Sequence, residues 1–301
     1  MLLNVLASTL DSATPLLFAA MGGIIAQQAG MLNIGIEGMM LAGAFGGVLV
    51  SYLTGSVPLA LLGAMGTAML VGLIFDFFVV TLRANLIVVG LAINILAVGA
   101  TGYILPVAFN VQGAFAPPGL RGLGAVPMGW LAGVPVLGRL LEGHTVLVYL
   151  SWISVFVTAL VLRHTVWGIR VRAVGEDPEA ARASGIPVKS IQYGAILMCA
   201  AIAGLAGAQL SLGELTLFNK AMTGGRGFIA LAAFFFGGFR PSGTAVACFV
   251  FGFFEALQYR VQQIGIPPQL IETLPYISVV LALASMQIVR AWRRRRATNA
   301  Q

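Results

Sequence analysis

The chain has 301 residues, of which 59% are hydrophobic and only 9% are charged, whereas soluble globular domains carry about 25% charged residues. This composition excludes a soluble enzyme or binding module and predicts an integral membrane protein. The net charge of +7 is not taken as a sign of nucleic-acid binding, because the basic residues cluster at the ends of apolar runs, where they indicate membrane orientation.

Long apolar segments follow one another along the chain and predict an all-α, polytopic bundle of about nine transmembrane helices in a single domain, residues 1–301. The segment near 227–239 is only about 20 Å long as a helix, against an apolar bilayer core of about 30 Å. It therefore predicts half of a broken helix, and counts of eight to ten spans are compatible with the pattern. The segments lie near 14–30, 37–54, 58–80, 86–107, 145–162, 191–212, 227–239, 242–258 and 272–290.

Lys and Arg residues give the orientation of these helices. The tail RAWRRRR at 290–296 is expected in the cytoplasm, because basic segments are retained there. Alternating backwards through the spans places the loop at about 163–190 in the cytoplasm. The Pro- and Gly-rich loop at about 108–144 and the N-terminus are then external.

One acidic residue stands out within the second apolar segment. Glu37 lies among glycines in MLNIGIEGMM, and Asn33 precedes it by four residues. The glycines permit a broken helix whose end faces a polar translocation path, as in many transporters. They are equally compatible with close helix packing, with Glu37 only at an interface. For Asn94, in the fourth segment, lining a path and bonding to a neighbouring helix are both open interpretations.

A second glycine-rich segment, GGRGFIALAAFFFGG at 224–238, loosely resembles the one around Glu37. In each, a charged residue between glycines, Glu37 or Arg226, precedes a Gly-Gly pair. The segments are five spans apart, so their orientations in the membrane are opposite. The match is weak, but opposite orientations are what an inverted repeat requires, and that hypothesis predicts that Glu37 and Arg226 approach a path from opposite faces.

Two further acids have simpler interpretations. Asp76 lies seven residues before Arg83 near the end of its span, which favours a structural pair or extension to the interface. Glu255, near the outer end of the eighth segment, is expected to reach water.

A short polar helix is predicted in the loop at about 163–190. Asp177 can cap it, Pro178 suits its first turn, and Gly185 can end it in the left-handed conformation. A helix of this length is marginal alone in water, so it must dock on something. Small residues such as Ala180 and Ala181, with no aromatic or leucine anchor, favour a protein surface over lipid headgroups.

The motifs of several catalytic classes are missing from the sequence. It contains no GxxxxGK[ST] phosphate loop, no HExxH, no Ser–His–Asp set and no Cys/His cluster. No metal site and no bound cofactor are therefore expected, and the energy source is expected to lie outside this chain.

Three motifs carry a resemblance to a known family. The chain resembles permease subunits of bacterial ABC importers for branched-chain amino acids, simple sugars and nucleosides. The motifs are LNIGIEGMMLAGAF at 32–45, the loop WGIRVRAVGEDPEAARASGIPV at 167–188 and the glycine-rich region at 225–258. The sequence NIGIEG within the first motif most resembles the nucleoside-type branch, and the simple-sugar branch comes second.

The resemblance implies roles for several residues. The short polar helix would be the coupling helix that sits in a cleft of a separate ATPase, which binds ATP, and Asn33, Glu37, Asn94 and Arg226 are candidates for the translocation path. The candidate coupling residues are Asp177, Pro178, Glu179, Ala180, Ala181, Arg182 and Gly185.

The resemblance also implies an assembly in the bacterial cytoplasmic membrane. Besides the ATPase, it would contain a second permease, identical or paralogous, and an external substrate-binding protein. The rival hypothesis from another class is an ion-coupled secondary transporter, which would need ion-coupling residues at the membrane midplane. A membrane enzyme would need a catalytic cluster, and none is visible.

Overall fold

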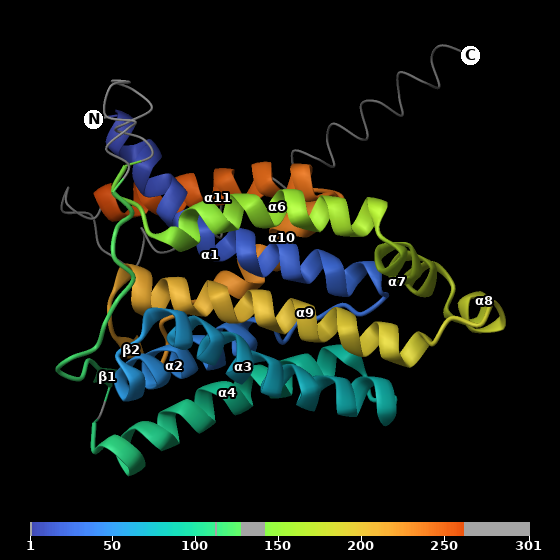
Figure 1. Ribbon diagram of the computed structural model, residues 1–301, viewed down its shortest axis with the longest axis horizontal. Coiled ribbons are helices and arrows are strands. Elements are labelled where there is room, and N and C mark those ends of the chain that lie inside the picture. Colours follow the sequence, from blue (N-terminus) through green and yellow to red (C-terminus); the bar gives the residue numbers. More distant parts are fainter. Residues whose placement is uncertain (1, 112, 128–141, 262–301) are drawn as a thin grey trace.

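The computed structural model describes residues 2–111, 113–127 and 142–261, and the description below is confined to them (Figure 1). Within these ranges, six helices are long and apolar enough to cross a membrane. They are α1 (Leu2–Gln28), α2 (Ile36–Thr54), α3 (Val57–Asp76) with its π-helical extension η1 (Phe77–Thr81), α4 (Leu86–Phe109), α6 (Val146–His164), and α9 (Val188–Ala208) with its π-helical extension η3 (Gln209–Glu214).

The other helices are α7 (Val166–Glu176), α8 (Pro178–Ala183), α10 (Arg226–Phe236) and α11 (Pro241–Val261). Each of the first eight apolar segments predicted from the sequence overlaps a helix, and the seventh is the short helix α10. The ninth segment, 272–290, and the basic tail at 290–296 lie outside the described residues.

Helix α1 begins well before the predicted boundary near residue 14 and runs through Pro15. A proline removes one backbone donor and usually ends a helix in water, but apolar spans tolerate it where neighbouring groups are satisfied. Here Leu16 and Leu17, which follow the proline, are fully buried in the core. Tertiary packing therefore overrides the proline signal.

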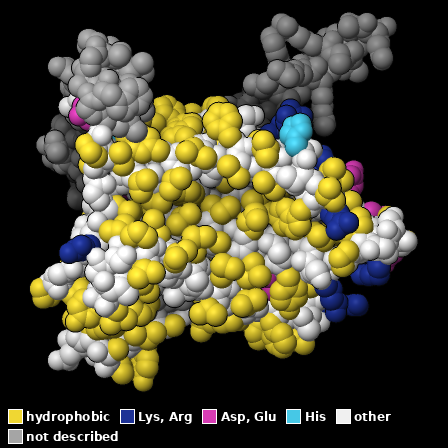
Figure 2. All heavy atoms as spheres, viewed as in Figure 1, with side chains coloured by type: hydrophobic (Ala, Val, Ile, Leu, Met, Phe, Trp, Pro, Cys, Tyr) yellow, Lys and Arg dark blue, Asp and Glu magenta, His cyan; other side chains and the backbone are white. Residues whose placement is uncertain are grey.

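The two ends of the bundle differ. At one end, called here the β1 end, β1 (Ala114–Phe115) pairs antiparallel with β2 (Phe218–Asn219), a small element that the all-α prediction did not include. At the other, called here the α8 end, α7 and α8 extend beyond the long helices (Figure 1). Figure 2 shows an apolar surface along the long helices, with most of the visible Lys and Arg side chains at the α8 end.

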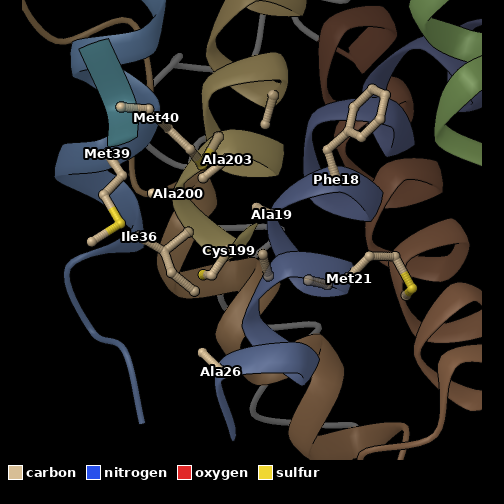
Figure 3. Close-up of a cluster of buried hydrophobic side chains, with 14 of the residues drawn as sticks. Phe18, Ala19, Met21, Ala26, Ile36, Met39, Met40, Cys199, Ala200 and Ala203 are labelled. Atoms are coloured by element: carbon tan, nitrogen blue, oxygen red, sulfur yellow. The ribbon is translucent and has the colours of Figure 1, made fainter. Parts of the chain in front are cut away.

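Helix α9 is the centre of the bundle and packs against α1, α2 and α3. It does so through small residues: Figure 3 shows Cys199, Ala200 and Ala203 of α9 beside Met39 and Met40 of α2. Small residues allow two helix backbones to approach closely, which is a main source of helix association in lipid.

Glycines mark the closest of these contacts. A Cβ atom on Gly43 of α2 would lie 2.5 Å from the Gly204 Cα of α9, and one on Gly22 of α1 would lie 2.8 Å from the Cys199 carbonyl oxygen. A Cβ atom on Gly207 would overlap the carbonyl oxygen of Met40. Glycines on α1, α2 and α9 are therefore required by packing, as the sequence-based alternative of close helix contacts proposed.

Candidate functional site

The N-termini of α2 and α10 meet inside the bundle, although they are far apart in the sequence. The Glu37 carboxylate, in the first turn of α2, accepts a hydrogen bond at Oε1 from the Gly225 N–H at 2.8 Å. Its Oε2 accepts a second from the Gly227 N–H at 2.6 Å. We call the set formed by Glu37, Asn94, Gly225, Arg226 and Gly227 the Glu37 junction.

Helix α10 begins with backbone N–H donors that find no acceptor among its own residues. Its N-cap residue is Gly225, with φ +82° and no side-chain cap, so the first N–H groups need another acceptor. A helix N-terminus also favours a negative charge. Glu37 supplies the hydrogen-bond acceptor and the negative charge from another helix. Gly227 permits the contact, because a Cβ atom there would lie 2.7 Å from the Glu37 nitrogen and from Oε2.

Two asparagines satisfy the N-terminus of α2. The Asn33 Oδ1 accepts from the Gly35 N–H at 2.9 Å, and the Asn94 Oδ1 of α4 accepts from the Gly38 N–H at 2.8 Å. The Asn94 amide also donates to the Ile34 carbonyl at 3.0 Å. Asn94 therefore bonds to the neighbouring segment, which was one of its two sequence-based interpretations, and its side chain remains partly exposed.

The guanidinium group of Arg226 turns away from the α10 N-terminus. It lies 2.5 Å from the Glu255 carboxylate of α11 and donates to the Met222 carbonyl at 3.1 Å. The Glu255 side chain is only 9% exposed, so the expectation that it reaches water is wrong. The partly exposed Arg226 thus partners a buried carboxylate, because an isolated buried charge is costly.

The four predicted path residues differ in their exposure and in their distance from the Glu37 junction. Glu37, Asn94 and Arg226 are partly exposed and belong to the Glu37 junction, whereas Asn33 is 1% exposed behind it. The Asn33 amide contacts the sulfur of Met39 at 3.2 Å and that of Cys199 at 3.5 Å. Asn33 thus links the entry to α2 with α9.

From the Glu37 junction, α2 and α10 run toward opposite ends of the molecule. Near the C-terminal end of α2, Tyr52 packs edge-on against Phe115 of β1. After α10, the Phe239 carbonyl accepts from Gln28 at the end of α1, on the side of α7. The two glycine-rich segments therefore have the opposite directions that the inverted-repeat hypothesis requires of them.

Helix α8 has the caps that its sequence predicts. The Asp177 Oδ1 accepts from the N–H groups of Glu179 and Ala180 at 2.9 and 3.0 Å. At the other end, Gly185 has φ +79°, and the Ile186 N–H reaches back to the Ala181 carbonyl at 3.0 Å. This closing geometry needs a left-handed residue, for which glycine is favoured.

The exposed face of α8 can meet another molecule, but one predicted contact residue is turned inward. Ala181 is only 4% exposed, while Pro178, Glu179, Ala180, Arg182 and Gly185 are exposed. Ala181 therefore seats α8 on its own chain.

Helix α7 joins α8 to the rest of the bundle and was not predicted. Its buried residues Gly168, Val171 and Val174 recur every three residues, and Thr165 caps its start at the Gly168 N–H. This spacing and the capping residue Thr165 are the sequence features that could have predicted α7. At its end, a Cβ atom on Gly175 would overlap the Gln28 carbonyl oxygen, so α7 lies against the turn that leads from α1 to α2.

Asp76 does not pair with Arg83. Its carboxylate is fully buried, and both oxygens have no hydrogen-bond partner among the described residues. Seven residues of α-helix would place the two side chains on one face. The π-helical turn η1 intervenes instead, and Arg83 lies beyond it at φ +57°, which explains why the expectation was wrong.

The described residues offer no group of three or more His, Cys, Asp and Glu side chains that could hold a metal ion. What they offer is a polar junction of two helix N-termini inside the helix bundle and an exposed capped helix at the α8 end.

Comparisons with known proteins agree over most of the chain. A family model described as "Branched-chain amino acid transport system / permease component" matches residues 5–288. A guanosine ABC transporter permease of Bacillus subtilis is 33% identical, with 92% of this chain and 89% of that protein covered. A nucleoside ABC transporter permease of Lactococcus lactis subsp. cremoris is 32% identical, with 93% and 91% covered.

A putative glucose ABC transporter permease of Haloferax volcanii is similar to the same extent, at 31% identity with 95% of this chain and 92% of that protein covered. No solved structure matches the chain.

Proposed function

The chain belongs to the family of branched-chain amino acid transport system permease components and is an ABC transporter permease, a transport subunit and not an enzyme; from this premise we propose that it serves an importer of nucleosides. The observation that carries the proposal is that relatives named for nucleoside and guanosine transport align with nearly the whole chain. Uptake of a simple sugar is the second candidate, because the relative named for glucose is nearly as similar.

Partners and orientation are part of the proposal. The α8 end would face the cytoplasm and meet a separate ATPase, and the β1 end would face an external binding protein. The basic side chains at the α8 end support this orientation (Figure 2). A second permease subunit, identical or paralogous, would complete the path in a bacterial cytoplasmic membrane.

The structure suggests how movement of α8 would reach the path. Through α7, α8 adjoins the turn at Gln28, where Gly175 allows backbone contact. On its other side α8 leads directly into α9, whose small residues pack on α2. Both routes end at the Glu37 junction, where the partly exposed Glu37, Asn94 and Arg226 would face the substrate. ATP-driven displacement of α8 would therefore shift both helix N-termini of the junction together.

An exposed residue of α8 tests its coupling role. We expect Ala180→Trp to reduce substrate-stimulated ATP hydrolysis several-fold while leaving the melting temperature of the permease unchanged, because Ala180 is exposed and its side chain does not pack on the chain. Ala181→Trp should instead lower the melting temperature, because Ala181 is 4% exposed and overpacking destabilises by about 1–3 kcal/mol. Ser190→Trp, exposed on α9, is the control. Normal ATP hydrolysis with Ala180→Trp would contradict the coupling role.

The substrate is tested by uptake into proteoliposomes that contain the permease with its co-purified partners. Labelled guanosine, adenosine and glucose are added with the binding protein outside and ATP inside. We expect ATP-dependent accumulation of a nucleoside and none of glucose. Accumulation of glucose alone would show that the substrate is a simple sugar and not a nucleoside. Uptake by the permease alone, driven by an ion gradient, would overturn the proposed mechanism.

A further inference from the structure

Three arginine side chains from three different elements border one small cavity at the α8 end. Its volume is about 130 Å³, and Gln28 of α1 and Phe239 also line it. The arginines are Arg163 in the last turn of α6, Arg172 of α7, and Arg240 between α10 and α11.

The charges around this cavity are not balanced by the chain as described. No acidic side chain among the described residues lines the cavity, and none of the three guanidinium groups forms an ion pair within residues 2–111, 113–127 and 142–261. The three side chains are exposed, so water and salt screen much of their mutual repulsion, but an anion bound in the cavity would be attracted to all three. The space equals the share of about four liquid water molecules, which is enough for one phosphate group.

The position of the cavity indicates the origin of such a phosphate. Arg163 lies at the end of a candidate membrane span, Val146–His164. Leu160 and Phe156 precede it by three and seven residues, so they lie on the same helix face. The Phe156 side chain is 76% exposed and Leu160 58% exposed. An exposed apolar strip that leads to a basic pocket matches a lipid with an anionic headgroup.

We propose that this cavity binds the phosphate of an acidic phospholipid whose acyl chain lies along Phe156 and Leu160. The lipid would join the end of α6, helix α7 and the turn between α10 and α11, and would thereby steady the elements that carry α8. A general preference for basic residues on one membrane side accounts for the sign of these charges. It does not account for their convergence on one cavity.

The test compares two variants of equal charge. The cavity variant is Arg163→Gln/Arg172→Gln/Arg240→Gln, and the control is Arg83→Gln/Arg170→Gln/Lys189→Gln, which removes three exposed cations at the same end but outside the cavity. The full-length chain is purified in detergent and titrated with phosphatidylglycerol, phosphatidylcholine or inorganic phosphate. Bound lipid is counted by native mass spectrometry, and size-exclusion and melting profiles monitor folding.

The expected result is tight binding of phosphatidylglycerol by the wild type and the control. The cavity variant should bind it at least about tenfold more weakly, because three charge-assisted contacts are lost. Equal loss in the control would show that only surface charge matters, and equal binding of phosphatidylcholine would show that only the apolar strip matters. Each result would overturn the proposal.

Two further outcomes are decisive. If inorganic phosphate alone stabilises the wild type as strongly as phosphatidylglycerol does, the site takes free anions and the assignment to lipid is wrong. The two variants are also co-purified with their partner subunits in lipid-free detergent, and if only the cavity variant loses the ATPase there, the arginines contact that protein and the assignment to lipid is wrong. Should the triple variant fail to fold, the single change Arg240→Gln, compared with Arg83→Gln, gives the same comparison of lipid affinity.

Discussion

Glu37→Ala is expected to abolish most transport and to lower the stability of the permease. The Glu37 carboxylate accepts two short hydrogen bonds from the first turn of α10, at 2.8 and 2.6 Å. Bonds to a charged acceptor contribute about 1.5–3 kcal/mol each, so we expect the free energy of unfolding to fall by roughly 3 kcal/mol. Because Glu37 is only partly exposed, water can replace the lost acceptor only in part. Uptake in proteoliposomes and the melting temperature of the purified chain measure both effects.

The matched changes separate the charge of Glu37 from its shape. Glu37→Gln keeps one acceptor oxygen but places an NH2 group against the other donor, so its effect should lie between those of Glu37→Ala and the wild type. Glu142→Ala removes an exposed carboxylate elsewhere and should have no effect. Wild-type uptake and stability in Glu37→Ala would show that the junction is not needed to hold α10.

Gly207→Val is expected to prevent α9 from packing against α2. A Cβ atom at this position would overlap the Met40 carbonyl oxygen and lie 2.6 Å from the Ala44 nitrogen. Both obstacles are backbone atoms of α2, so no side chain can move away to relieve the overlap. We expect a loss of about 3 kcal/mol or more, at the upper end for overpacked sites, and little folded protein in size-exclusion chromatography.

A glycine in open surroundings provides the control for this change. A Cβ atom added to Gly99 of α4 would meet no described atom within 4 Å, apart from its own helix backbone and its chain neighbours. Gly99→Val should therefore leave the melting temperature nearly unchanged or raise it slightly, because glycine is a poorer helix former than valine by about a few tenths of a kcal/mol. If both substitutions behave alike, close backbone contact is not what holds α9 to α2.

Much of the fold follows from local features of the sequence. The apolar runs predicted helices close to α2, α3 and α4, and the residues Asp177 and Gly185 predicted both ends of α8. The predictions were wrong or incomplete where tertiary contacts decide the structure. Pro15 lies inside α1, and the pairing of β1 with β2 joins segments about 100 residues apart, which no local pattern specifies.

Sequence patterns identified some members of the Glu37 junction but not the contacts between them. Glu37 and Arg226 were identified because each is a charge among glycines in an apolar run. Their segments do meet, yet Glu37 bonds to the backbone around Arg226 while the arginine pairs with Glu255. A sequence gives the cost of a buried charge but not which of several partners offsets it. Ala181 shows the same limit, since only the packed structure reveals that it faces inward.

The Glu37 junction also constrains how the chain is made. Glu37 and Gly227 are 190 residues apart, so α2 emerges from the ribosome long before the amides that its carboxylate will hold. Because chains are synthesised from the N-terminus at about 5–20 residues per second, Glu37 must wait for roughly ten seconds or more without these partners. During that interval the Glu37 carboxylate needs water or other donors in place of the two N–H groups of Gly225 and Gly227. When α10 is made, the carboxylate that accepts from its first N–H groups is therefore already part of the chain.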